Sequence, residues 1–118
     1  MVHDKKSTLC LDKGYHYNFD TGTEIRITND NMLEYNNRKI ELTYTEGEIL
    51  HLLLKNRGKI ISSEEIYEKV WGEPYKAAST NIVMVHILNL RRKIEKLQSD
   101  SNKVKIIKTA WGKGYYIE

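Results

Sequence analysis

The stretch STNIVMVHILNLRRKIEK, residues 79–96, decides how this sequence folds. It contains neither glycine nor proline and is long enough for about five turns of helix. One apolar stripe runs along it at the i, i+4, i+7, i+11 spacing of a single helix face, formed by Val83, Ile87, Leu90 and Ile94. The sequence therefore predicts a long helix that packs on a core through this stripe.

The opposite face of the predicted helix combines side-chain amides, cations and one small apolar group, without a carboxylate. Amides can read base edges, a small apolar side chain can contact a thymine methyl group, and cations neutralise phosphates. Such a face suits the groove of a nucleic-acid duplex, whereas the simpler interpretation is a solvated helix surface. Its residues are Asn81, Val85, Asn89, Arg92 and Lys96, with Ile82 and Lys93 at its edge.

Composition indicates one soluble domain. The chain has 118 residues, of which 40% are hydrophobic and 30% charged. No apolar run approaches the ~20 residues of a membrane span, and residues 1–8 lack a signal-peptide core. The single cysteine, Cys10, cannot form an internal disulfide, so we expect a cytoplasmic protein.

Charge is unevenly distributed along the chain. Residues 79–118 carry eight Lys/Arg and three Asp/Glu, a net charge of +5, whereas residues 1–78 carry a net charge of −2. The basic charge therefore lies on the predicted helix and on the segment that follows it. This asymmetry indicates that a polyanion binds there.

The segment before the helices reads as a small sheet after a flexible start, residues 1–7. Residues 8–43 alternate apolar and aromatic residues with Asn, Asp and Gly breaks, which is the hairpin pattern. We expect an antiparallel sheet of about four strands, although residues 24–31 could instead be an insertion. The candidate strands are residues 8–11, 15–19, 23–28, 32–35 and 39–42.

Three helices are predicted within residues 43–97. The first starts at a capping box formed by Thr43 and Glu46, and runs to residue 56 before a stop at Gly58. The second starts at the similar motif SSEE, residues 62–65, and ends at Gly72. Residues 72–78 then connect it to the third helix. This exposed loop, with Glu73, Tyr75 and Lys76, is either a partner contact or a plain connector.

Residues 103–118 predict a hairpin directly after the basic helix. Residues 104–108 and 115–117 read as strands, and the turn between them, residues 109–114, contains two glycines. Glycines allow the backbone to approach another surface closely. We expect a wing with Trp111 and Lys113 at its tip and Lys105 and Lys108 on its first strand.

The order of sheet, three helices, basic third helix and hairpin is that of an α+β winged helix-turn-helix, which we expect to cover residues 8–118. The sequence resembles the OmpR/PhoB family of response-regulator DNA-binding domains, and its VanR-like branch in particular. The resemblance covers residues 33–118. It rests on IELTYTEGEILHLLLKNRGKIISSEEIYEKVWG (40–72), VMVHILNLRRKIE (83–95) and IIKTAWGKGYYIE (106–118).

The resemblance implies a DNA-contacting role for individual residues. Val85 and Asn89 would face bases in the major groove, joined by Asn81 from the amide-bearing face. Trp111 and Lys113 would lie at the minor groove. The expected phosphate contacts are Trp71, His86, Arg91, Arg92, Lys93, Lys96, Thr109 and Tyr115.

The sequence departs from the family at a few of these positions. Many members carry arginine where this chain has Leu88 and Asn89, and arginine is also common where Trp111 stands. Asn89 can still pair with adenine, whereas Leu88 cannot hold a phosphate.

Membership of this family would imply several binding partners. We expect double-stranded DNA with direct repeats, a receiver domain in the parent protein, a cognate sensor kinase and, through loop 72–78, RNA polymerase. The chain would be either an excised domain or a stand-alone regulator. The alternative is a protein-interaction winged helix that contacts RNA polymerase through the third helix or through loop 72–78.

An enzyme is not expected. The four histidines show no metal-ligand spacing, and Cys10 has no visible histidine partner. No cofactor, metal or membrane partner is predicted.

Overall fold

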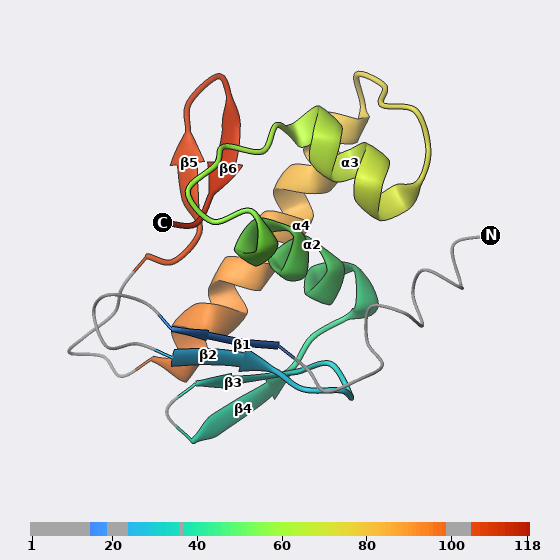
Figure 1. The fold of residues 1–118 in the computed structure, drawn as a ribbon. Helices are drawn as coiled ribbons and strands as arrows, with labels where there is room; N and C mark the ends of the chain where they lie inside the picture. The colour runs from blue at the N-terminus through green and yellow to red at the C-terminus, as the bar shows by residue number, and fades with distance from the viewer. Residues whose placement is uncertain (1–14, 19–23, 36, 99–104) are drawn as a thin grey trace.

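The computed structural model describes residues 15–18, 24–35, 37–98 and 105–118. In this part of the chain an antiparallel sheet is followed by three helices and a hairpin (Figure 1). The expected flexible start, residues 1–7, and the candidate strand at residues 8–11 lie outside the described residues.

The sheet has four strands in the order of the sequence, β1 (Tyr15–Asn18), β2 (Glu24–Ile27), β3 (Met32–Tyr35) and β4 (Arg38–Glu41). Each strand is antiparallel to the next, and Ile25 lies opposite Tyr35. Because β2 pairs with a strand on either side and buries Ile25 and Ile27, residues 24–27 are an integral strand. The alternative of an insertion over residues 24–31 stays a prediction.

Helix α2 (Tyr44–Lys55) begins at the predicted capping box. The Glu46 backbone N–H donates to Thr43 Oγ1 at 3.1 Å, and the Thr43 N–H donates to Glu46 Oε1 at 2.9 Å. The helix ends earlier than expected, with Asn56 as its C-cap. Gly58, at φ +86°, instead turns the chain toward the C-terminus, where its N–H donates to the Ile117 carbonyl at 2.8 Å.

Helix α3 (Ser63–Trp71) starts and stops where the sequence predicts. The Ser62 hydroxyl accepts from the Glu65 N–H at 3.0 Å, and Gly72 closes the helix in a left-handed conformation. Helix α4 (Ser79–Leu97) extends one residue beyond the prediction and has no side-chain N-cap. The Ser79 hydroxyl instead accepts from the Lys76 N–H, which fixes the incoming loop.

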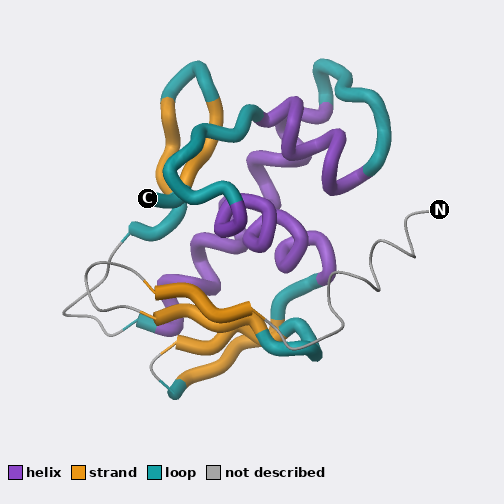
Figure 2. The backbone as a smooth tube through the Cα atoms, viewed as in Figure 1, coloured by secondary structure: helices purple, strands orange, loops and turns teal. Residues whose placement is uncertain are grey.

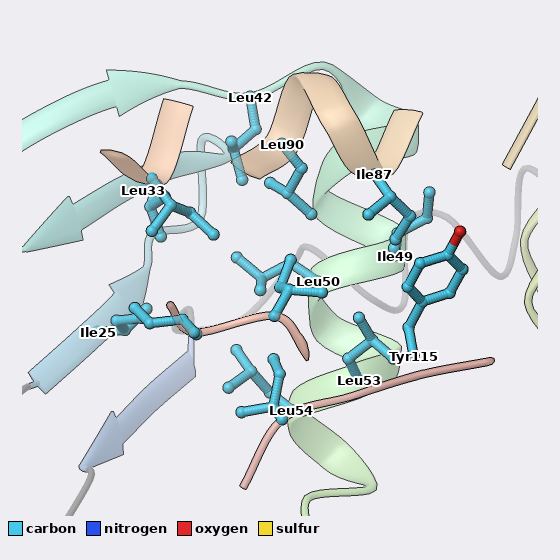
Figure 3. Close-up of a cluster of buried hydrophobic side chains, with 14 of the residues drawn as sticks. Ile25, Leu33, Leu42, Ile49, Leu50, Leu53, Leu54, Ile87, Leu90 and Tyr115 are labelled. Carbon is cyan, nitrogen blue, oxygen red and sulfur yellow. The ribbon is translucent and has the colours of Figure 1, made fainter. Parts of the chain in front are cut away.

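One core joins these elements, and Figure 3 shows side chains of the sheet, α2, α4 and the hairpin meeting in it. The predicted stripe of α4 is fully part of this core: Val83 and Leu90 have no exposed area, and Ile87 and Ile94 are buried. α2 supplies Ile49, Leu50, Leu53 and Leu54. The stripe thus sets which face of α4 is left outward.

The hairpin is shorter than predicted. It consists of β5 (Lys108–Ala110) and β6 (Gly114–Tyr116), seen as the short strands beside the C-terminus in Figure 2. Ile106 and Ile107 are buried and anchor the chain to the core before the hairpin starts, so Lys105 lies outside the strand. Thr109 belongs to a strand and not to the turn.

Candidate nucleic-acid interface

The outward face of α4 contains the five residues predicted for it. All five are exposed: Asn81, Val85, Asn89, Arg92 and Lys96. Since the apolar stripe is buried on the other side, the core fixes the direction of this face. Arg92 and Lys96 lie in the second half of the helix, and the structure records no hydrogen bond or ion pair for their charged groups with other described residues.

Lys93 is an exception among the predicted phosphate contacts. Its ammonium donates to Glu46 Oε1 at 2.6 Å and to the Glu41 carbonyl at 2.9 Å. Glu46 is buried, with 3% of its surface exposed. A buried carboxylate needs a counter-charge, and Lys93 supplies it. The charge of Lys93 is therefore held between α4 and α2, which argues against the expected phosphate contact by this residue.

Arg91 connects α4 to the hairpin. Its Nε donates to the Ile107 carbonyl at 3.1 Å, and its Nη2 donates to Thr109 Oγ1 at 2.7 Å. The guanidinium carbon lies 5.6 Å from the centre of the Tyr115 ring. Burial lowers the pKa of Arg91 and the Tyr115 hydroxyl opposes that shift, yet arginine starts so far above neutrality that the group stays charged.

The wing places two of its four predicted residues at its tip. Trp111 is 89% exposed, and Lys113 beside it is also exposed. Thr109 and Tyr115 lie lower: the Thr109 hydroxyl accepts from Arg91, and Tyr115 is buried. The backbone of Tyr115 also exchanges two hydrogen bonds with Ile61, at 2.8 and 2.9 Å, which ties the wing to the segment before α3.

The other two predicted phosphate contacts, Trp71 and His86, lie together at the junction of α3 and α4. Their rings meet edge to face with centroids 5.2 Å apart, and His86 Nδ1 lies 2.8 Å from the Ile82 carbonyl. Tyr67 stacks on Trp71 at 5.0 Å. This aromatic cluster fixes the angle at which α4 leaves α3.

Loop 72–78 packs onto the same cluster. Tyr75 meets Tyr67 edge to face, and its hydroxyl is hydrogen-bonded to that of Thr80. The Tyr67 hydroxyl donates to Glu73 at 3.3 Å. Of the three residues predicted as a partner contact, Tyr75 is half-buried, while Glu73 and Lys76 are exposed.

The predicted contact set did not include every exposed apolar residue of α4. Met84 and Leu88 are 49% and 46% exposed, respectively, on the helix that carries Val85. Helical periodicity could have identified Met84 and Leu88, since a rotation of 100° per residue places both side chains outside the buried stripe.

Two classes of site can be addressed in the described part of the chain. It contains no group of three or more His, Cys, Asp or Glu residues that could hold a metal ion. None of its helices combines the length and apolarity that a membrane crossing requires.

A model of the family described as "Transcriptional regulatory protein, C terminal" matches residues 37–117. The chain belongs to this family. Together with the sheet, the three helices and the wing, this match defines a winged-helix DNA-binding domain of the OmpR/PhoB response-regulator type. The family is one of transcription-factor domains and not of enzymes.

Curated relatives are longer than this chain. The uncharacterised transcriptional regulatory protein YrkP of Bacillus subtilis is 44% identical over 98 residues, which cover 82% of this chain and 41% of YrkP. The regulatory protein VanR of Enterococcus faecium is 42% identical over 83 residues, which cover 70% of this chain and 35% of VanR. The chain thus spans about two fifths of their length or less.

Solved structures agree on the fold. The DNA-binding domain of CpxR from E. coli superposes with a TM-score of 0.66 at 28% identity, covering 87% of this chain and 95% of that one. The DNA-binding domain of RstA from Klebsiella pneumoniae, solved in complex with the RstA box, has a TM-score of 0.66 at 21% identity over 86% and 95% of the two chains. At that identity the likeness concerns the fold alone.

Proposed function

We propose that this chain binds double-stranded DNA sequence-specifically, as the effector domain of a bacterial two-component transcriptional regulator. α4 enters the major groove, and the wing, residues 109–115, reaches the adjacent minor groove. One observation carries the proposal: α4 turns amides, apolar groups and cations outward next to an exposed wing tip. Asn81, Val85 and Asn89 then contact bases.

The phosphate contacts come from both sides of the reading face. Arg92 and Lys96 supply charge from the second half of α4, and Lys113 lies with Trp111 on the wing, which reaches the minor groove. Trp71, at the end of α3, and His86, in the first half of α4, add a further contact. Binding releases counterions from the duplex, so affinity falls as salt concentration rises.

The parent protein supplies the regulation. Because the matched curated relatives are more than twice the length of the aligned segment, we infer a receiver domain and a cognate sensor kinase in the cytoplasm. Direct repeats in the target would place two such domains in tandem on one duplex.

Fluorescence anisotropy with a random pool of duplexes, followed by sequencing of the retained fraction, tests the proposal. We expect a short enriched motif. Asn89→Ala should then lower the discrimination at one position by about 1–3 kcal/mol. Arg92→Ala should weaken binding to all DNA sequences to the same extent, and should reduce the slope of log K against log salt by about one. Arg26→Ala, which removes an exposed cation of the sheet, is the matched control. Unchanged preference in Asn89→Ala would refute its base-reading role.

A second candidate function is contact with RNA polymerase through loop 72–78. The packing of Tyr75 and Glu73 onto Tyr67 favours it, because a preformed loop binds a partner at a lower entropic cost. Lys76→Ala should weaken polymerase binding and leave the affinity for DNA unchanged. Equal polymerase binding by the variant and the native chain would exclude this role of Lys76.

A further inference from the structure

The first three turns of α4 expose an apolar and uncharged surface. Residues 79–90 contain no Asp, Glu, Lys or Arg. Four large apolar side chains are exposed there, Ile82 at 39%, Met84 at 49%, Val85 at 53% and Leu88 at 46%. The amides of Asn81 and Asn89 lie among them.

The cations of α4 begin only at Arg91, and two of the four are bound within the protein. Arg91 is held by the wing and Lys93 by Glu46. Arg92 and Lys96 remain outward, in the half of the helix that follows the apolar surface. This leaves the first half without an arginine or lysine.

The chemistry of base recognition indicates which bases this surface can contact. In helix-turn-helix proteins the N-terminal residues of the recognition helix contact base edges. Guanine is read mainly by arginine or lysine, adenine by asparagine or glutamine, and the thymine methyl group by apolar side chains. The first half of α4 offers the usual partners of adenine and thymine, but neither arginine nor lysine, the usual partners of guanine.

We propose that α4 reads a major-groove site of A·T pairs, and that the 5-methyl groups of thymine, packed against Val85 and Leu88, supply much of its preference. The inference rests on the proposed function and specifies its target. We infer that a DNA duplex binds to this apolar surface, because the exposed cations Arg92 and Lys96 continue the same face of α4 with positive charge.

The random-pool selection tests the target class first. An enriched motif with A·T pairs at its core supports the inference. A motif with guanine at those positions overturns it and leaves DNA binding itself standing. Uniform binding that vanishes with salt, without any enriched motif, contradicts the proposed function instead.

Replacing each thymine of the selected duplex by deoxyuridine then tests the methyl contact. This change removes only the 5-methyl group and keeps every hydrogen-bonding atom. We expect about a fourfold loss of affinity at each contacted position, which corresponds to the ~0.8 kcal/mol of one buried CH₂ group. Equal affinity for the thymine and uracil duplexes at all positions would refute the inference.

Variants of the exposed side chains assign the contacts. In Val85→Ala or Leu88→Ala, replacing the contacted thymine by deoxyuridine should cost little or no affinity, since the methyl group has already lost its partner. Ile60→Ala is the matched control: Ile60 is 47% exposed but lies between α2 and α3. The Ile60→Ala variant should show the same loss of affinity on the deoxyuridine duplex as the native chain. A loss that is the same in all three variants would mean that uracil acts through the duplex alone, and would overturn the assignment.

Discussion

Lys93 donates to Glu46 over 2.6 Å, and the same carboxylate oxygen accepts from the Thr43 N–H. One buried carboxylate therefore completes the N-cap of α2 and fixes the position of α4 against it. The contact joins two segments 47 residues apart in the sequence.

Lys93→Gln should lower the free energy of unfolding by about 2–3 kcal/mol, because it leaves the Glu46 carboxylate buried without its counter-charge. Urea unfolding followed by circular dichroism measures this. Lys96→Gln, an exposed position three residues on, should change the stability by less than about 0.5 kcal/mol. Equal stability of the two variants would mean that the ion pair does not stabilise the fold.

Arg91 and Arg92 are neighbours with different expected roles. Arg91→Ala should cost about 1–2 kcal/mol of stability, since it removes two hydrogen bonds between α4 and the wing. Arg92→Ala should leave the stability unchanged and reduce the slope of log K against log salt by about one. Thermal melts and binding titrations at several salt concentrations separate the two. A reduced salt slope in Arg91→Ala would show that Arg91 contacts a phosphate as well.

Gly114 lies where the wing packs closely on the segment before α3. A Cβ there would lie 2.2 Å from the Ile61 carbonyl oxygen, at φ +151°. Gly114→Ala should therefore destabilise the protein by about 3 kcal/mol. Gly112→Ala is the control, because the same turn leaves open space around Gly112 and only its positive φ costs about 1 kcal/mol. Chemical denaturation should rank the variants in this order, and the reverse order would contradict the steric argument.

Stability should decrease in mild acid because of His51. Burial lowers the pKa of His51, and the nearby Lys55 lowers it further. The unfolded chain, with a histidine pKa of about 6.5, then binds more protons than the folded one, so stability is full above that pH and is lost as the pH falls below it. Melting temperatures between about pH 5 and 8 should show a shallower decline in His51→Gln. Parallel curves for the two proteins would contradict this.

The fluorescence of Trp111 should report DNA binding. Its indole is 89% exposed at the wing tip, whereas Trp71 is half-buried and stacked on Tyr67. In free protein, iodide should quench Trp111 more than Trp71, and a bound duplex should protect it. Trp111→Phe isolates the signal of Trp71. Full iodide access to Trp111 at saturating DNA would exclude a minor-groove contact by this side chain.

Features with local causes could be predicted from the sequence. The Thr43–Glu46 capping box, the Ser62 cap and the Gly72 stop depend on residues within one turn. The α4 stripe depends only on helical periodicity, and all four of its members are buried. The outward direction of Asn89 and Val85 follows from the same periodicity, so the exposed face of α4 was predictable too.

Features with distant causes were not predictable. Arg92 lies on the outer face of the predicted helix and Lys93 at its edge, and helical periodicity gives no sign that Lys93 reaches a buried carboxylate of another element. Ile106 and Ile107 have the β-branched composition of a strand, yet both side chains are buried, and the hairpin starts after them. In both cases a tertiary contact overrides the local pattern.

The outward side chains in the first half of α4 differ from those at Arg91 and Lys93, which hold the helix to other elements, and this difference bears on how such proteins diversify. The side chains of Asn81, Val85, Leu88 and Asn89 make no hydrogen bond or ion pair with other described residues, so their replacement disturbs none of the polar contacts that hold the helix. After gene duplication, substitutions at these few positions could therefore change the DNA sequence that is bound and leave the fold unchanged. The braces at Arg91 and Lys93, by contrast, would remain under purifying selection in every descendant.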